Sequence, residues 1–124
     1  MSFYSVDIED VLRTQIGDST LTASANPLPP SFTLPYALVT ALGGTTHDLV
    51  IDELRASVDV YADTWANAHT YAQIALARTR GLQTAYFVEV DALPYHNPDP
   101  LRPDLARVTF DLTIGVRNIP HTTN

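Results

Sequence analysis

The sequence of 124 residues contains no cysteine, which excludes disulfide bonds, thiolate metal sites and cysteine nucleophiles and leaves the redox compartment open. Histidine is the other common ligand of structural metals. The four histidines show no ligand-like spacing such as an i, i+4 pair on a helix: His47, His69, His96 and His121. The sequence therefore predicts no metal site.

Positive charge is scarce, and lysine is absent altogether. Seven arginines stand against 14 acidic residues, which gives a formal net charge of −7. The arginines are scattered along the chain, whereas proteins that bind nucleic acids usually carry a basic stripe. We therefore expect no tight binding to DNA or to an anionic membrane surface.

Long hydrophobic runs are also missing. The first ten residues carry Asp7, Glu9 and Asp10 where an export signal needs basic residues followed by an apolar run. Residues 19–47 contain no charged side chain, but their four prolines and many hydroxyl groups rule out a membrane helix. A soluble protein without an export signal is expected.

The composition is that of an ordinary globular chain, with 45% hydrophobic and 17% charged residues. One hydrophobic core usually serves about 100 to 150 residues. We therefore expect residues 1–124 to form a single α+β domain.

Two segments have the periodicity of amphipathic helices. In residues 6–16 the apolar positions recur at helical spacing, and Gly17 can supply a left-handed stop. A second helix should start after Asp63 or Thr64 and end at Gly81. Its apolar stripe, which we assign to the core, comprises Trp65, Ala68, Ala72, Ala75 and Leu76.

Four segments indicate strands: residues 36–42, 55–61, 86–91 and 107–117. The pair Gly43 and Gly44 should end the first of them as a turn. The order of elements is then α-β-β-α-β-β. It predicts a four-stranded, mainly antiparallel sheet with both helices packed on one face.

Proline-rich stretches interrupt this pattern in two places. We interpret residues 18–35 as an extended arm and residues 94–104 as a stiff projecting loop, because proline fixes φ and donates no backbone hydrogen bond. Neither segment shows apolar periodicity that would tie it to the core. Both are therefore candidates to contact another protein.

The sequence offers no catalytic constellation. It has no phosphate-cradling glycine loop and no nucleophile elbow. Tyr95, His96, Asp99 and Arg102 do gather in one loop, but catalysis needs a rigid supporting shell, which this loop lacks. A contact site or a solvated loop is the better interpretation, and we predict that the protein is not an enzyme.

By strand alternation, several carboxylates fall on the sheet face opposite the core, together with two aromatic residues, Tyr61 and Phe87. The acidic residues of this face are Asp59, Glu89, Asp91 and Asp111. Such a face is either simply solvated or, given the exposed aromatics, an assembly surface.

The succession of these elements resembles the tail terminator, or tail completion, proteins of long-tailed bacteriophages. The resemblance rests on the apolar strand and glycine pair of residues 35–44, the strand 56–62, the alanine-rich helix, the Pro98 to Pro100 loop, and the strand 107–117. It is a pattern of elements and carries no catalytic signature.

The resemblance implies a ring, usually of six subunits, that caps the tail tube, ends tail polymerisation and joins the tail to the head connector. Its partners would be copies of itself, the tail tube protein and the connector protein, and DNA would pass through without specific binding. It further implies a place at the neck of the virion, assembly in the host cytoplasm, and no cofactor.

By position, the candidate assembly contacts are Leu34, Tyr36, Tyr61, Phe87, Tyr95, His96, Asp99 and Arg102. Two alternatives stay open. One is a head-tail connector (stopper) or tail tube protein, and the other is a small ligand-binding domain with a pocket between sheet and helix.

Overall fold

The computed structural model describes residues 2–4, 6–46 and 50–121. Nine elements follow one another along the chain: β1 (Ser2–Tyr4), α1 (Ile8–Ile16), β2 (Thr22–Ala25), β3 (Tyr36–Thr46), β4 (Ile51–Ala62), α2 (Trp65–Arg80), β5 (Ala85–His96), β6 (Ala106–Arg117) and β7 (Ile119–His121).

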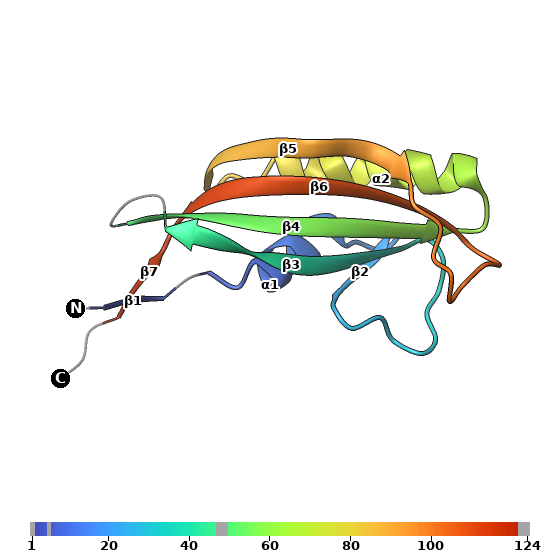
Figure 1. Cartoon of the computed structure of the whole chain (residues 1–124), viewed down its shortest axis with the longest axis horizontal. Helices are drawn as coiled ribbons and strands as arrows, with labels where there is room; N and C mark the ends of the chain where they lie inside the picture. Colours follow the sequence, from blue (N-terminus) through green and yellow to red (C-terminus); the bar gives the residue numbers. More distant parts are fainter. Residues whose placement is uncertain (1, 5, 47–49, 122–124) are drawn as a thin grey trace.

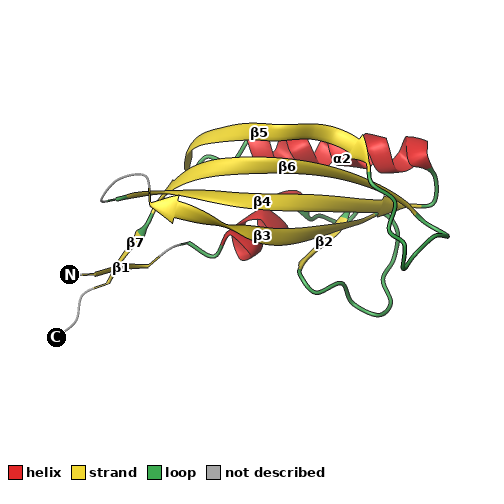
Figure 2. Cartoon of the chain, in the orientation of Figure 1, coloured by secondary structure: helices red, strands yellow, loops and turns green. Residues whose placement is uncertain are grey.

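The main sheet has five strands in the order β2-β3-β4-β6-β5, and both helices cover one of its faces (Figures 1 and 2). The expected α+β class with two helices on one face is confirmed. The expected count of four strands is wrong, whereas the pairing is mainly antiparallel as expected, in β3-β4, β4-β6 and β5-β6. A fifth strand, β2, lies inside the presumed arm and pairs in parallel with β3. Its small residues Thr-Ala-Ser-Ala gave no apolar alternation.

The main core lies between the sheet and the helices. Alternate residues of β6, from Val108 to Val116, point into it and are almost fully buried. Three alanines of α2 (Ala68, Ala72 and Ala75) are fully buried, because their short side chains let the helix lie close to the strands. The predicted core faces of β6 and α2 are thus confirmed, with one exception.

That exception is Trp65, which was expected in the core but is 38% exposed. Thr64 caps α2, so Trp65 is the first residue of the helix. The buried residues of α2 begin only at Ala68, one turn later. The Trp65 ring stacks on His96 at the end of β5, with 4.5 Å between centroids. His69, one turn further along, is exposed.

The glycine pair does not form a turn. β3 continues to Thr46 through a bulge between Ala41 and Gly43. Gly43 has φ +88°, and a Cβ on Gly44 would lie 2.3 Å from the carbonyl oxygen of Glu53. The glycines therefore permit a bulge and a close strand approach. Gly17 also departs from expectation, because its φ of −73° is not left-handed.

The two ends of the described chain pair with each other. β1 and β7 form an antiparallel two-stranded ribbon that extends beyond the main sheet (Figure 1). We expected residues 118–124 to be frayed, but residues 119–121 pair in register with residues 4 to 2. Residues 122–124 lie outside the described part.

Phe87 packs over Gly115 on the face opposite the helices. A Cβ on Gly115 would lie 2.2 Å from the nearest atom of the Phe87 ring. The ring can lie this close because Gly115, its partner in the strand pairing, has no side chain; β5 is bulged between Ala85 and Phe87. The half-buried ring thus covers a site where β6 has no side chain.

Gly115→Ala should therefore destabilise the protein by about 1–3 kcal/mol through overpacking against the Phe87 ring. The free energy of urea-induced unfolding measures this loss. In a Phe87→Ala background the same change should cost much less, because the clash is gone. An equal cost in both backgrounds would show that the ring contact is not responsible.

Candidate assembly surface

The described residues hold no cluster of three or more histidine or acidic side chains that could bind a metal. Among them, no helix is long and apolar enough to cross a membrane. The features that remain as candidate sites are the sheet face opposite the helices, the two ends of the molecule, and one cavity.

A second, smaller core lies on the sheet face opposite the helices. Tyr36, Leu38 and Tyr61 are buried there, at one end of β3 and β4. Leu28 and Phe32 of the proline-rich arm and Leu105 of the proline-rich loop pack against them. The expectation that Tyr61 is exposed is wrong: only 1% of it is accessible, because the arm and the loop cover it.

Phe32 is the centre of this second core. Its ring lies 4.7 Å from that of Tyr36 and 5.6 Å from that of Tyr61, both in tilted contact. The guanidinium carbon of Arg102 lies 5.3 Å from the Phe32 ring centre, on the loop side. Phe32 therefore joins arm, sheet and loop. The hydroxyl of Tyr36 also donates to Ser24 of β2.

A buried polar network fixes the loop to the sheet. The hydroxyl of Tyr61 donates to Oδ2 of Asp99 at 2.9 Å, and the backbone N–H of Leu101 donates to Oδ1 at 2.9 Å. Arg107 of β6 pairs with the same carboxylate at 3.7 Å and donates through Nε to the carbonyl of Asn97 at 2.6 Å. The first half of the loop is thus held against the sheet.

The electrostatics of this network follow from burial and pairing. Burial would raise the pKa of Asp99, but hydrogen bonds from Leu101 and Tyr61 and the charge of Arg107 outweigh it, so the pKa lies below its usual range. Burial raises the pKa of the Tyr61 hydroxyl. Asp99 is therefore an ionised, well-partnered carboxylate rather than an acid poised for proton transfer.

The two proline-rich segments thus have internal partners, contrary to expectation. The sequence missed them because Leu28, Phe32, Leu105 and Asp99 lie singly among prolines, where no period shows. Fixed in place, the segments still present apolar side chains outward.

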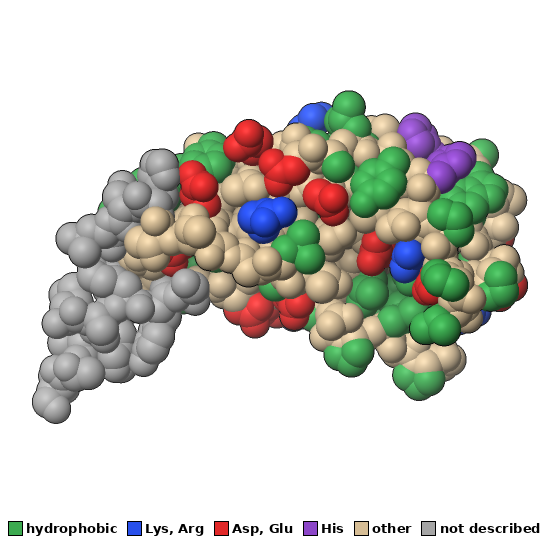
Figure 3. Space-filling view, viewed as in Figure 1, with side chains coloured by type: hydrophobic (Ala, Val, Ile, Leu, Met, Phe, Trp, Pro, Cys, Tyr) green, Lys and Arg blue, Asp and Glu red, His purple; other side chains and the backbone are tan. Residues whose placement is uncertain are grey.

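Five large apolar residues are exposed at this end of the molecule, and we call them the apolar end. They are Leu34 (38% exposed), Trp65 (38%), Leu93 (65%), Tyr95 (41%) and Leu101 (87%). They come from the arm, from the start of α2, from β5 and from the loop. Figure 3 shows apolar side chains crowding one half of the sheet face and acidic ones the other half.

The carboxylates of this face come from β4, β5 and β6. Oδ1 of Asp59 accepts from Thr109 at 2.6 Å, and Oδ2 of Asp91 accepts from Thr113 at 2.6 Å. Desolvation raises the pKa of Asp59, with further increases from Asp111 and Asp99, although Thr109 and Arg107 oppose them. The predicted placement of these carboxylates opposite the core is confirmed.

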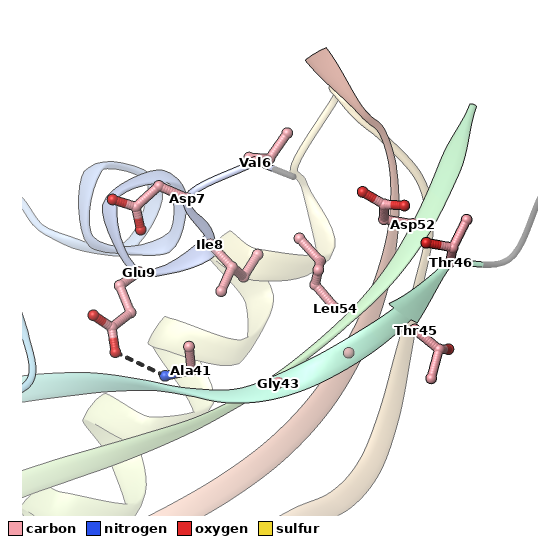
Figure 4. Close-up of a pocket in the computed structure, with 11 residues that line it drawn as sticks. Val6, Asp7, Ile8, Glu9, Ala41, Gly43, Thr45, Thr46, Asp52 and Leu54 are labelled. Atoms are coloured by element: carbon pink, nitrogen blue, oxygen red, sulfur yellow. Dashed lines mark hydrogen bonds between the residues drawn. The ribbon is translucent and has the colours of Figure 1, made fainter. Parts of the chain in front are cut away.

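A cavity of about 400 Å³ lies at the other end, between the start of α1 and the far ends of β3 and β4 (Figure 4). Ile8, Leu54 and Ala41 supply apolar walls, and three carboxylates line it as well. Two of these already serve the fold: Asp7 caps α1, and Glu9 accepts the Ala41 N–H at 2.9 Å. Their roles argue against a catalytic pair. The cavity lies between helix and sheet, which is where the ligand-binding alternative expects a pocket.

The structure divides the eight predicted contact residues. Tyr36, Tyr61 and Asp99 are buried and hold other segments in place, while Phe87 and Arg102 are half-buried. Exposed residues at the apolar end include Leu34, Tyr95 and His96. Leu93, Leu101 and Trp65 were not predicted as contacts. The first two are isolated leucines beside prolines, and Trp65 had been assigned to the core.

No family model and no curated protein matches this chain. Among solved structures, one chain from the virion of a native gene transfer agent particle aligns with it at 12% identity and a TM-score of 0.45. The alignment covers 90% of this chain and 88% of the other. At this level the likeness assigns neither fold nor role to this chain.

Tyr61→Phe should destabilise the protein by about 1–2 kcal/mol, because the buried carboxylate of Asp99 loses a hydrogen bond. Urea unfolding gives the change in stability, and hydrogen exchange of residues 97–105 should become faster. Tyr86→Phe is the matched control, since Tyr86 is 58% exposed. Equal effects of the two changes would refute the role given to the Tyr61 hydroxyl.

Asp59→Asn should stabilise the protein at pH 7. The raised pKa of Asp59 means that the folded state binds its proton more tightly than the unfolded chain does, so ionisation at higher pH costs stability. Asparagine keeps the acceptor for Thr109 without the charge.

The gain from Asp59→Asn should shrink as pH falls and vanish below about pH 4, where the carboxyl is protonated in both states. Urea denaturation midpoints of the variant and the wild type, measured at several pH values from about 3.5 to 7, test this; this range covers the usual pKa of a carboxyl group. Glu89→Gln removes the same charge from an exposed site of the same face. An equal gain there would point to general charge relief instead.

Proposed function

We propose that the protein is a structural component of a long-tailed phage virion, which forms a ring on the end of the tail tube, stops its polymerisation and joins it to the head connector. The observation that carries this proposal is the apolar end. Exposed apolar patches on small soluble proteins mark binding surfaces, and here five large side chains share one end.

The rigidity of the apolar end supports an assembly role. Phe32 and the Tyr61–Asp99 hydrogen bond hold the arm and the loop against the sheet. A contact surface that is already ordered loses less conformational entropy when it binds. Trp65 and Tyr95 are also residue types that often dominate binding energy.

The acidic half of the sheet face fits a DNA-conducting role. Fixed carboxylates repel phosphate, so a ring whose inner wall carried them would let DNA pass without retaining it. The net charge of −7 is consistent with this. In a tail terminator, which the sequence resembles, the apolar end would make the assembly contacts and the acidic half of the sheet face would line the DNA channel.

The proposal is tested by adding the purified protein to tail tube subunits during polymerisation and measuring tube length and end density by electron microscopy. Shorter tubes with a cap at one end are expected. Leu101→Asp should reduce capping, whereas Thr14→Asp, on the exposed surface of α1, should not. Incorporation along the whole tube would support a tube subunit instead. No binding to the tube would refute the proposal.

A further inference from the structure

The ribbon of β1 and β7 is a separate sheet from the main one. Within the described ranges, its two strands make extensive contacts only with each other. A two-stranded sheet on its own is at best marginally stable in water. Two of the three residues of β1, Phe3 and Tyr4, are aromatic, and Ile119 of β7 is 48% exposed. A ribbon of this kind gains stability from a further surface to pack against.

β5 offers such a surface. It is a strand of 12 residues at the edge of the main sheet, paired on one side with β6. An edge strand presents backbone N–H and C=O groups that can pair with a strand of another chain. Three of its side chains are large, apolar and exposed: Tyr86, Leu93 and Tyr95.

The two features lie at opposite ends of the molecule. The ribbon extends past the end of the sheet where β6 finishes, whereas Leu93 and Tyr95 lie near the end where β5 finishes (Figure 1). The ribbon of one molecule therefore cannot cover its own Leu93. A contact between them joins unlike surfaces of two molecules, and contacts of that kind generate closed rings or open chains.

We propose that copies of this chain associate head to tail, with β1 of one copy added to the free edge of β5 of the next, next to Leu93 and Tyr95. This inference rests on the proposed function only for the closing of the chain into a ring. β1 rather than β7 makes the pairing, because Pro120 of β7 has no N–H to donate. Every copy supplies both surfaces, so a second copy satisfies both features without another protein.

The net charge of the protein determines how this contact depends on salt. With a net charge of −7, copies repel one another at long range, so association has to depend on apolar burial and backbone hydrogen bonds. Added salt screens this repulsion. Self-association should therefore strengthen as salt concentration rises.

The test uses the full chain and three variants in analytical ultracentrifugation. The ribbon variant is Phe3→Asp with Tyr4→Asp, the edge variant is Leu93→Asp, and the control is Thr14→Asp. Wild type and control should form oligomers, while the ribbon and edge variants should associate at least about tenfold more weakly. Circular dichroism checks folding, which the exposure of Leu93 should leave intact.

Mixing the ribbon and edge variants gives the decisive result. In an equimolar mixture, the intact ribbon of the edge variant can still pair with the intact edge of the ribbon variant. Dimers that neither variant forms alone, and nothing larger, are expected. A wild type that stays monomeric, variants that associate as the wild type does, or a mixture that stays monomeric would overturn the inference.

Capping of tail tubes, measured in parallel, separates this inference from the proposed function. Normal capping together with unchanged oligomers of the edge variant would overturn the head-to-tail contact alone. Oligomers that behave as predicted without any binding to tubes would overturn the proposed function alone.

Discussion

The hydrogen bond from Tyr61 to Asp99 is the contact on which the organisation of the outer sheet face depends. It buries a tyrosine on the face opposite the helices and ties the loop between β5 and β6 to the end of the central strand β4. Arg107 pairs with the carboxylate of Asp99, and Phe32 of the arm packs against the ring of Tyr61. A buried charge is tolerable only when it is paired in this way. The sheet consequently has a full core on one face and a short second core on the other.

This second core converts two proline-rich segments into fixed surfaces. Proline alone stiffens a chain but does not place it. Placement comes from single apolar residues, Leu28 and Phe32 in the arm and Leu105 in the loop, that pack against Tyr36 and Tyr61. The side chains that find no room in this core, such as Leu34 and Leu101, are left at the surface. Rigid support and exposed apolar tips are what an assembly surface requires, and both arise from the same packing.

Sequence reasoning succeeded where periodicity is strong. The alternation in β6 and the alanine stripe of α2 gave the main core, the helix positions and the face on which both helices lie. It failed where the signal is a single residue or a long-range pairing. β2 has no apolar period, β1 and β7 pair across the whole length of the chain, and Gly43 and Gly44 signal a bulge as strongly as a turn. The burial of Tyr61 could not be predicted, because alternation gives the face of a side chain but not what covers that face. The same gap explains why only part of the predicted contact set is exposed.

The central claim is that this chain is a virion protein at the junction of tail and head. Immunogold labelling of virus particles released by cells that produce the protein tests this claim most directly, because it needs no assumption about ring size or partners. Label confined to the neck, at the head-proximal end of the tail, is the predicted result. Label distributed along the tail, or particles that lack the protein altogether, would contradict the claim.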